Sequence, residues 1–107
     1  MSDPYAAERQ ALIEAVTKGD GHLSPEVRTA IVDCTRGQAA DVVIPDALVR
    51  FVDLVARDAP GIADADVDAV KAAGFDEEAV FEAIVAAALG ASLARLEAVD
   101  ALLMRRS

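Results

Sequence analysis

The sequence has few of the residues that most often mark a specific chemistry. Its 107 residues include one cysteine, one histidine and no tryptophan, and aromatic side chains make up 4%. A single cysteine excludes an internal disulfide. Because alanine and valine dominate the 54% hydrophobic fraction, we expect a core of small side chains on closely packed helices.

Basic residues are also scarce. The chain has 10 lysines and arginines against 19 aspartates and glutamates, which gives a net charge of −9. The acidic residues are spread over both halves of the chain, so no basic arm stands out that could contact phosphates. Nucleic acid and an anionic membrane surface are therefore poor partners for this protein.

The N-terminal residues lack a basic segment followed by an apolar run, which predicts that there is no secretory signal. The expected location is the cytoplasm of a bacterium. A chain of 107 residues is the size of one domain, so we expect residues 1–107 to form a single domain.

No stretch alternates apolar and polar residues with the period of a β-strand, so the sequence predicts an all-α fold of about five helices. Asp3, Ser24, Asp64 and Asp76 are expected to cap helices at their N-termini, and Gly74 is expected to end one in the left-handed conformation. The expected helices cover residues 4–18, 25–36, 45–59, 65–73 and 77–104.

The C-terminal helix is the most apolar part of the chain. Between Ala83 and Ala94 the sequence has no charged residue. A helix there is apolar on every side, so we expect neighbours to enclose it completely. The uncharged run is shorter than the roughly 20 residues that a bilayer crossing needs, which predicts a buried core helix and no membrane span.

Small residues recur every four positions along this helix, and this spacing lets two helix backbones approach closely. They form two strips, Ala83, Ala87, Ala91 and Ala86, Gly90, Ala94. Four short helices appear too few to enclose the C-terminal helix, so we expect a homo-oligomer with these strips at its contact. The alternative is a monomer whose small residues fit its own short helices.

Residues 64–82 read Asp-Ala-Asp-Val-Asp-Ala-Val-Lys-Ala-Ala-Gly-Phe-Asp-Glu-Glu-Ala-Val-Phe-Glu, and Ala86-Ala87-Ala88 and Arg95-Leu96 follow. This stretch resembles the C-terminal half of the AhpD-like superfamily, which includes carboxymuconolactone decarboxylases and alkylhydroperoxidase-like proteins. The resemblance covers roughly residues 45–103. It implies an all-helical fold that assembles into dimers, trimers or hexamers.

The resemblance does not carry the family's chemistry with it. The peroxidase members use a Cys-x-x-Cys pair with a following histidine, and the decarboxylase branch relies on a histidine in the same segment. Here that segment holds only Cys34, followed by Thr35-Arg36-Gly37, and His22 lies before it. We therefore expect a member without the redox pair.

Cys34 is the only possible thiol nucleophile. It follows Val27, Ala30 and Ile31 at helical spacing, so we expect it on the inward face as a packing residue. The alternative is a reactive thiol that reduces peroxide with the help of an outside thiol.

His22 and Arg95 are the other weak candidates for a site. His22 is either a proton carrier or metal ligand, or an ordinary exposed loop residue. Arg95 is expected to pair with a carboxylate from Glu14, Glu82 or Asp100 if it is enclosed, and the alternative is a site for a substrate carboxylate. No pattern in the sequence calls for a metal or another cofactor.

Two functions remain open from the sequence. The first is a non-redox AhpD-like homo-oligomer that serves assembly or binds a small molecule. The second is an enzyme, alkylhydroperoxidase-like or carboxymuconolactone decarboxylase-like, with a site between chains built from Cys34, His22 and Arg95. Whether the chain is an enzyme at all stays undecided at this level.

Overall fold

The computed structural model describes residues 4–106 and shows an all-α fold, with no β-strand among these residues. The helices are α1 (Ala6–Lys18), α2 (Pro25–Arg36), α3 (Asp46–Asp58), α4 (Asp64–Ala72) and α5 (Glu77–Arg106), and a 3-10 turn, η1 (Ala59–Gly61), follows α3. The predicted fold class and the predicted number of helices are confirmed. The molecule is elongated and measures 50 × 29 × 21 Å along its principal axes.

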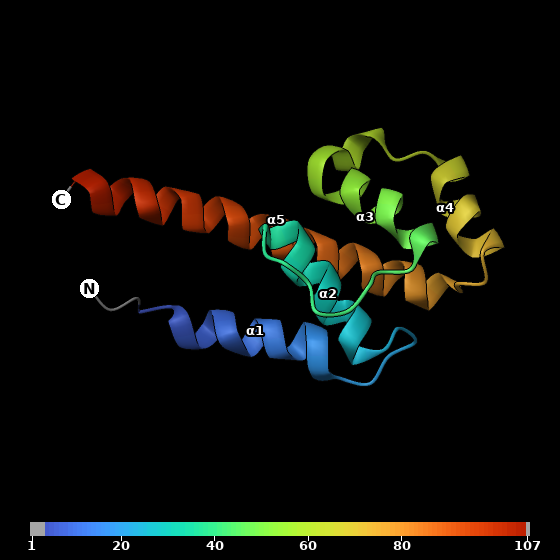
Figure 1. Cartoon of the computed structure of the whole chain (residues 1–107), viewed down its shortest axis with the longest axis horizontal. Helices are drawn as coiled ribbons and strands as arrows, with labels where there is room; N and C mark the ends of the chain where they lie inside the picture. The colour runs from blue at the N-terminus through green and yellow to red at the C-terminus, as the bar shows by residue number, and fades with distance from the viewer. Residues whose placement is uncertain (1–3, 107) are drawn as a thin grey trace.

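The other helices pack around the long helix α5 (Figure 1). Helices α3 and α4 lie on one side of it and α1 lies on the other, while α2 packs against its middle in the most extensive contact of the fold. Both ends of the described chain lie at the same narrow end of the molecule, where α1 and the last turns of α5 extend beyond α2.

Local signals in the sequence set most helix ends. The Ser24 side chain accepts a hydrogen bond from the Val27 N–H at 3.2 Å, and the Asp76 carboxylate accepts one from the Ala79 N–H at 2.8 Å. Gly37 and Gly74 end α2 and α4 with φ of 91° and 107°, a region that favours glycine. These predicted caps of α2 and α5, and the predicted role of Gly74, are confirmed.

The start of α4 differs from the prediction. Ala63 is the N-cap and Asp64 is the first helical residue. The carboxylate of Asp66 reaches back and accepts a hydrogen bond from the Ala63 N–H at 2.9 Å. An acidic side chain in the first turn thus replaces the expected cap, because it satisfies a backbone N–H that the helix leaves free. The expected cap of α1, Asp3, lies outside the described residues.

The small residues of α5 pack against the chain's own α2. Ala83, Ala86 and Ala87 are fully buried, and Gly90 is buried with them. A Cβ atom at Gly90 would overlap the carbonyl oxygen of Val32 and the hydroxyl of Thr35. The expectation that these strips form the contact between subunits is therefore wrong, because α2 already occupies that face of α5.

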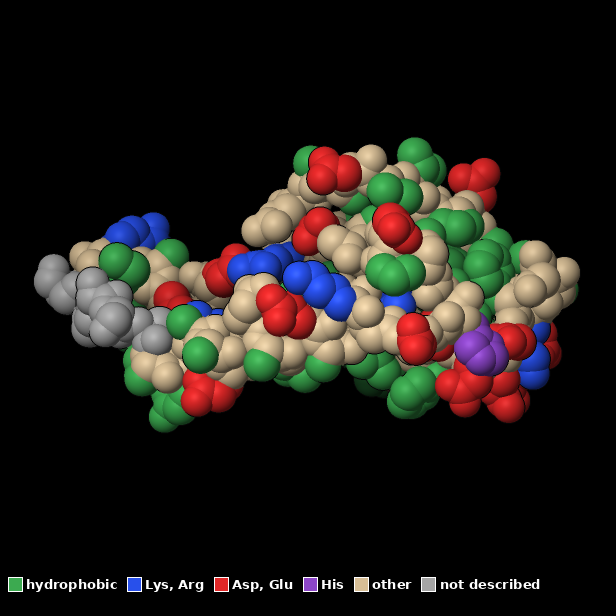
Figure 2. Space-filling model, turned by 90° about the horizontal axis from the view of Figure 1, so that it is seen from below, with side chains coloured by type: hydrophobic (Ala, Val, Ile, Leu, Met, Phe, Trp, Pro, Cys, Tyr) green, Lys and Arg blue, Asp and Glu red, His purple; other side chains and the backbone are tan. Residues whose placement is uncertain are grey.

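The opposite face of α5 is open to solvent. Phe81 is 61% exposed, and Leu96, Val99 and Leu103 are 41%, 52% and 58% exposed. Apolar side chains also lie on the surface of the narrow end of the molecule (Figure 2). The expectation that α5 is enclosed on every side is wrong for a single chain, because α1, α2, α3 and α4 cover only part of its circumference.

By length and composition alone, α5 passes as a helix that could cross a membrane. Its most apolar window of 18 residues has a mean hydropathy of 1.7, and 44% of that window is buried in the protein. The core helix of a soluble protein passes the same test. Crossing a bilayer would require α5 to give up its contacts with α2 and α3, so the fold described here uses α5 as a core helix.

The C-terminus of α1 is held by a buried arginine. Arg28 on α2 is 4% exposed. Its guanidinium donates hydrogen bonds to the carbonyl oxygens of Leu23 at 3.2 Å, Val16 at 3.0 Å and Gly19. Val16 and Gly19 belong to the end of α1, where carbonyl groups lack helical partners and favour a cation. Arg28 therefore joins α1 to α2.

Candidate functional site

An open cleft separates α2 from α3. Its volume is about 660 Å³, which is within the range of small-molecule sites. The side chains that line it come from the end of α2, the following loop and one face of α3. They are Cys34, Thr35, Ile44, Asp46, Val49, Arg50, Val52, Asp53, Ala56 and Arg57. The cleft exists because α3 packs mainly on α5 and makes few contacts with α2.

The cleft combines an apolar wall with charged groups. Val49 is half exposed and offers apolar surface to a ligand, whereas Ile44 and Val52 are 9% and 2% exposed and contribute little. Arg57 is bound by Asp53 through two hydrogen bonds, one of them 3.0 Å from Nε to Oδ1. Asp53 and Arg57 lie four positions apart and form an i, i+4 ion pair on α3.

Arg50 is the cation of the cleft that is available to a ligand. Within residues 4–106 its side chain has no hydrogen bond or ion pair, although Asp46 lies four positions before it on α3 and lines the same cleft. Two aspartates and two arginines line the cleft, so it has no net positive charge, and the Arg50 guanidinium is the positive group that the described residues leave unpaired. It can bind a carboxylate with two parallel hydrogen bonds.

Cys34 is exposed and lines this cleft. The expectation that it packs on the inward face is wrong. Ala30 and Ile31 on the same stripe of α2 are buried against the core, but α3 does not close over the end of α2. The thiol is therefore accessible from the cleft, and no second cysteine exists to form a disulfide with it.

Arg95 on α5 contacts one of the residues that line this cleft. It is exposed, and its guanidinium donates a hydrogen bond of 3.3 Å to the carbonyl oxygen of Ala56, a residue that lines the cleft. In the described part of the chain it forms no ion pair with Glu14, Glu82 or Asp100. The expected pairing is absent because Arg95 is not enclosed and water can solvate its charge.

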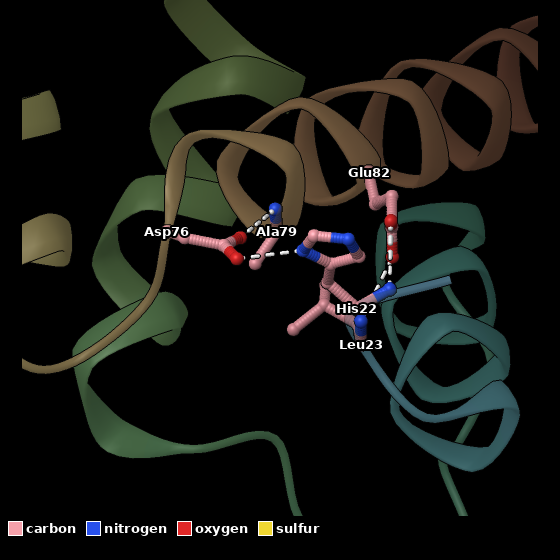
Figure 3. Close-up of polar contacts among 5 residues, drawn as sticks. All are labelled: His22, Leu23, Asp76, Ala79 and Glu82. Atoms are coloured by element: carbon pink, nitrogen blue, oxygen red, sulfur yellow. Dashed lines mark hydrogen bonds and ion pairs between the residues drawn. The ribbon is translucent and has the colours of Figure 1, made fainter.

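His22 stands at a junction between the loop before α2 and the start of α5 (Figure 3). Its Nδ1 lies 2.6 Å from Oδ2 of Asp76, which also caps α5. The backbone N–H groups of His22 and Leu23 donate hydrogen bonds to the Glu82 carboxylate at 2.9 and 2.8 Å. The loop is thereby tied to the first two turns of α5.

Two charges at this junction shift each other's titration. The hydrogen bond that the imidazole donates to the Asp76 carboxylate, followed by the negative charge of that carboxylate, raises the pKa of His22 above 6.5. The Ala79 N–H, followed by the hydrogen bond with His22, lowers the pKa of Asp76 below 3.8. Acidic side chains surround the single histidine on the surface (Figure 2). His22 is an exposed loop residue, and its contacts tie the loop before α2 to the start of α5.

The three candidate residues do not form one site within a chain. His22 precedes α2, and Cys34 lies nine residues after its first residue, so about 14 Å of helix separates them. Arg95 is near the cleft that holds Cys34, whereas His22 belongs to the other end of α5. In the described range, no group of three or more histidine, cysteine, aspartate or glutamate side chains is arranged to hold a metal ion.

Three residues that matter in the structure were not singled out from the sequence. Arg50 is the cation of the cleft that the described residues leave unpaired, and an arginine on a helix is usually an ordinary surface residue. Arg28 was missed because an arginine within an apolar stripe is usually a surface residue. Glu82 was considered only as a partner for Arg95, and no local signal shows that it binds a loop 59 residues away.

Comparisons with protein-family models, with curated proteins and with solved structures found no match.

Proposed function

We propose that this protein is a self-associating helical protein that binds a small apolar anion in the cleft between α2 and α3, without redox chemistry. The observation that carries the ligand proposal is Arg50, an unpaired guanidinium beside the apolar wall of a cleft of about 660 Å³. The ligand class that fits is a monocarboxylate with a short hydrocarbon chain, because the chain would cover the half-exposed Val49 while the carboxylate binds the guanidinium.

Octanoate is a suitable probe, and the single thiol reports on the cleft. Cys34 lines the cleft and is exposed, so a ligand there should slow its reaction with a disulfide reagent. We expect octanoate to protect Cys34 and to bind in calorimetry. Absence of both effects at millimolar octanoate would refute the ligand proposal.

Arg50→Gln separates binding of the carboxylate from binding of the hydrocarbon chain. Loss of one hydrogen-bonded charge pair, worth about 1.5 kcal/mol, should weaken octanoate binding by about tenfold. The neutral octanamide should bind equally to the wild type and the variant. Lys71→Gln removes an exposed cation from α4, which does not line the cleft, and should leave octanoate binding unchanged.

Membership of the AhpD-like superfamily is part of the same proposal. The support is the residue pattern over 64–96 together with an all-α fold in which this segment forms α4 and most of α5. We also place the protein in the bacterial cytoplasm, in keeping with its acidic surface and its single free thiol. Assembly is expected to use the open face of α5, since the small-residue strips are already occupied.

A second candidate function is peroxide reduction through Cys34, and the observation that favours it is the exposure of the thiol at a cleft. The thiolate would attack the peroxide oxygen, form a sulfenic acid and release water or an alcohol, and an outside thiol would reduce it. Peroxide consumption with a dithiol donor should be the same for the wild type and Cys34→Ser if the protein is non-redox. Turnover that depends on Cys34 would instead support this second function.

A further inference from the structure

The open side of α5 presents an uncharged stripe over most of the helix. We call it the outer face of α5 and define it as Phe81, Val85, Ala88, Ser92, Leu96, Val99 and Leu103. Successive members are three or four residues apart, so they lie on one side of the helix. All are exposed except Val85, which is partly buried. The stripe is about 33 Å long.

An exposed apolar stripe of this length is unusual on a monomeric protein and marks a surface that another molecule covers. The second face of the same helix is buried against α2 and α3, so a partner can reach α5 only from the outer face. The partner must therefore present a matching elongated apolar surface.

The outer face matches itself when it is read in the opposite direction. Phe81 and Leu103 lie equally far from Ser92 along the helix, and so do Val85 and Val99. Ala88 and Leu96 form the third pair, which places a small side chain opposite a large one. A second copy lying antiparallel would thus bring bulky residues together at both ends, fit Leu96 over Ala88, and place Ser92 against Ser92 at the centre.

The charges at the ends of α5 favour the same arrangement. Glu77 and Glu78 are in its first turn, and Arg105 and Arg106 are in its last turn. In the antiparallel register, Glu78 of one copy faces Arg106 of the other, since both lie 14 positions from Ser92. Two such ion pairs would form in a symmetric dimer, and the helix dipoles would also oppose each other. A parallel pair would instead place glutamates against glutamates.

We infer that a second copy of this chain packs antiparallel on the outer face of α5, with the twofold axis passing beside Ser92. The inference rests on the proposed self-association and specifies its surface and its register. The small side chains at Ala88 and Ser92 allow the two helix axes to approach to about 8 Å at the crossing point. The interface is isologous, as in most dimers, because each copy uses the same surface.

Cross-linking of single cysteines tests the register. In a Cys34→Ser background, Ser92→Cys should give a covalent dimer with a short bis-maleimide, because the two thiols meet at the axis. Phe81→Cys alone and Leu103→Cys alone should not, because each thiol is about 33 Å from its counterpart. An equal mixture of the Phe81→Cys and Leu103→Cys proteins should cross-link to each other. Self-linking of either single variant would overturn the antiparallel register.

Charge reversal tests the end contacts without any cross-linker. Glu78→Arg and Arg106→Glu should each weaken the dimer by about tenfold, and the double variant should restore wild-type affinity because the exchanged pair attracts again. Sedimentation equilibrium gives the dissociation constants. Two variants with wild-type affinity, or a double variant weaker than either single one, would overturn the proposed pairing.

The same experiments separate failure of the register from failure of self-association. If the wild type sediments as one chain at micromolar concentration, the proposal of a homo-oligomer fails and the register fails with it. If it is a dimer but Phe81→Cys links to itself, only the register fails. If it is a monomer that floats with phosphatidylcholine vesicles, the outer face belongs to a membrane contact and the dimer is refuted.

Discussion

Replacing Gly90 by alanine should destabilise the protein, although alanine is the better helix former. In an exposed helix interior this exchange stabilises by about 1 kcal/mol. At Gly90, however, a Cβ atom would overlap the Val32 carbonyl oxygen and the Thr35 hydroxyl, and it would lie 3.1 Å from the Cβ of Thr35. The hydroxyl can rotate away, but the carbonyl is part of the backbone of α2.

The two effects oppose each other, and the overlap is expected to dominate. Overpacking a tight contact costs about 1–3 kcal/mol. We take about 3 kcal/mol because a backbone atom is involved, and subtracting the gain in helix propensity leaves a loss of about 2 kcal/mol. For a domain of this size, that loss lowers the melting temperature by about 8–16 °C.

Thermal and urea unfolding followed by far-ultraviolet circular dichroism measure this loss. Ala98→Gly is the matched control, because Ala98 is exposed on the same helix and the change alters propensity alone, by about 1 kcal/mol. Combining Gly90→Ala with Thr35→Ala should recover only part of the stability, since the Val32 carbonyl remains. A Gly90→Ala protein as stable as the wild type would refute the close packing of α2 on α5.

Three further predictions concern the ends of the helices. Arg28→Met should lower the free energy of unfolding by about 2–4 kcal/mol in urea titrations, because three carbonyl oxygens lose a charged donor; an unchanged midpoint would contradict its anchoring role. Glu82→Ala should cost about 1–2 kcal/mol through loss of two hydrogen bonds to the loop, and faster amide exchange at the N–H groups of His22 and Leu23 should accompany it. The pair of His22 and Asp76 should stabilise the fold most between the pKa values of the two groups. The contribution from His22 is fully present below pH 6.5 and is lost as pH rises through the raised pKa of His22. The contribution from Asp76 is fully present above pH 3.8 and is lost as pH falls through the lowered pKa of Asp76. Unfolding curves of wild type and His22→Asn that differ by the same amount at every pH would contradict this coupling.

The cleft illustrates what a helical stripe cannot predict. Val27, Ala30, Ile31 and Cys34 share one face of α2, and that much follows from their spacing. Which part of that face is covered depends on where α3 lies, and α3 packs on α5. Burial of Ala30 and Ile31 and exposure of Cys34 therefore result from the position of another helix, which no local pattern in α2 predicts.

The junction at His22 shows the same limit for polar contacts. Asp76 was expected to cap α5, and it does, because a cap involves residues three positions apart. Its contact with His22 and the contact of Glu82 with the loop join residues 54 to 60 positions apart. Such contacts depend on α2 packing alongside α5. The sequence therefore predicts the cap at Asp76, but it does not predict the contacts of Asp76 and Glu82 with the loop before α2.

The sequence by itself determined the helical elements, the caps at Ser24 and Asp76 and the absence of a second thiol, because these depend on residue type and on neighbours within a few positions. Only the tertiary structure decided which side of α5 is inside. An apolar helix carries no mark that distinguishes its buried side from its open side. Here the close fit of Gly90 against α2 buries one side and leaves the outer face of α5 exposed.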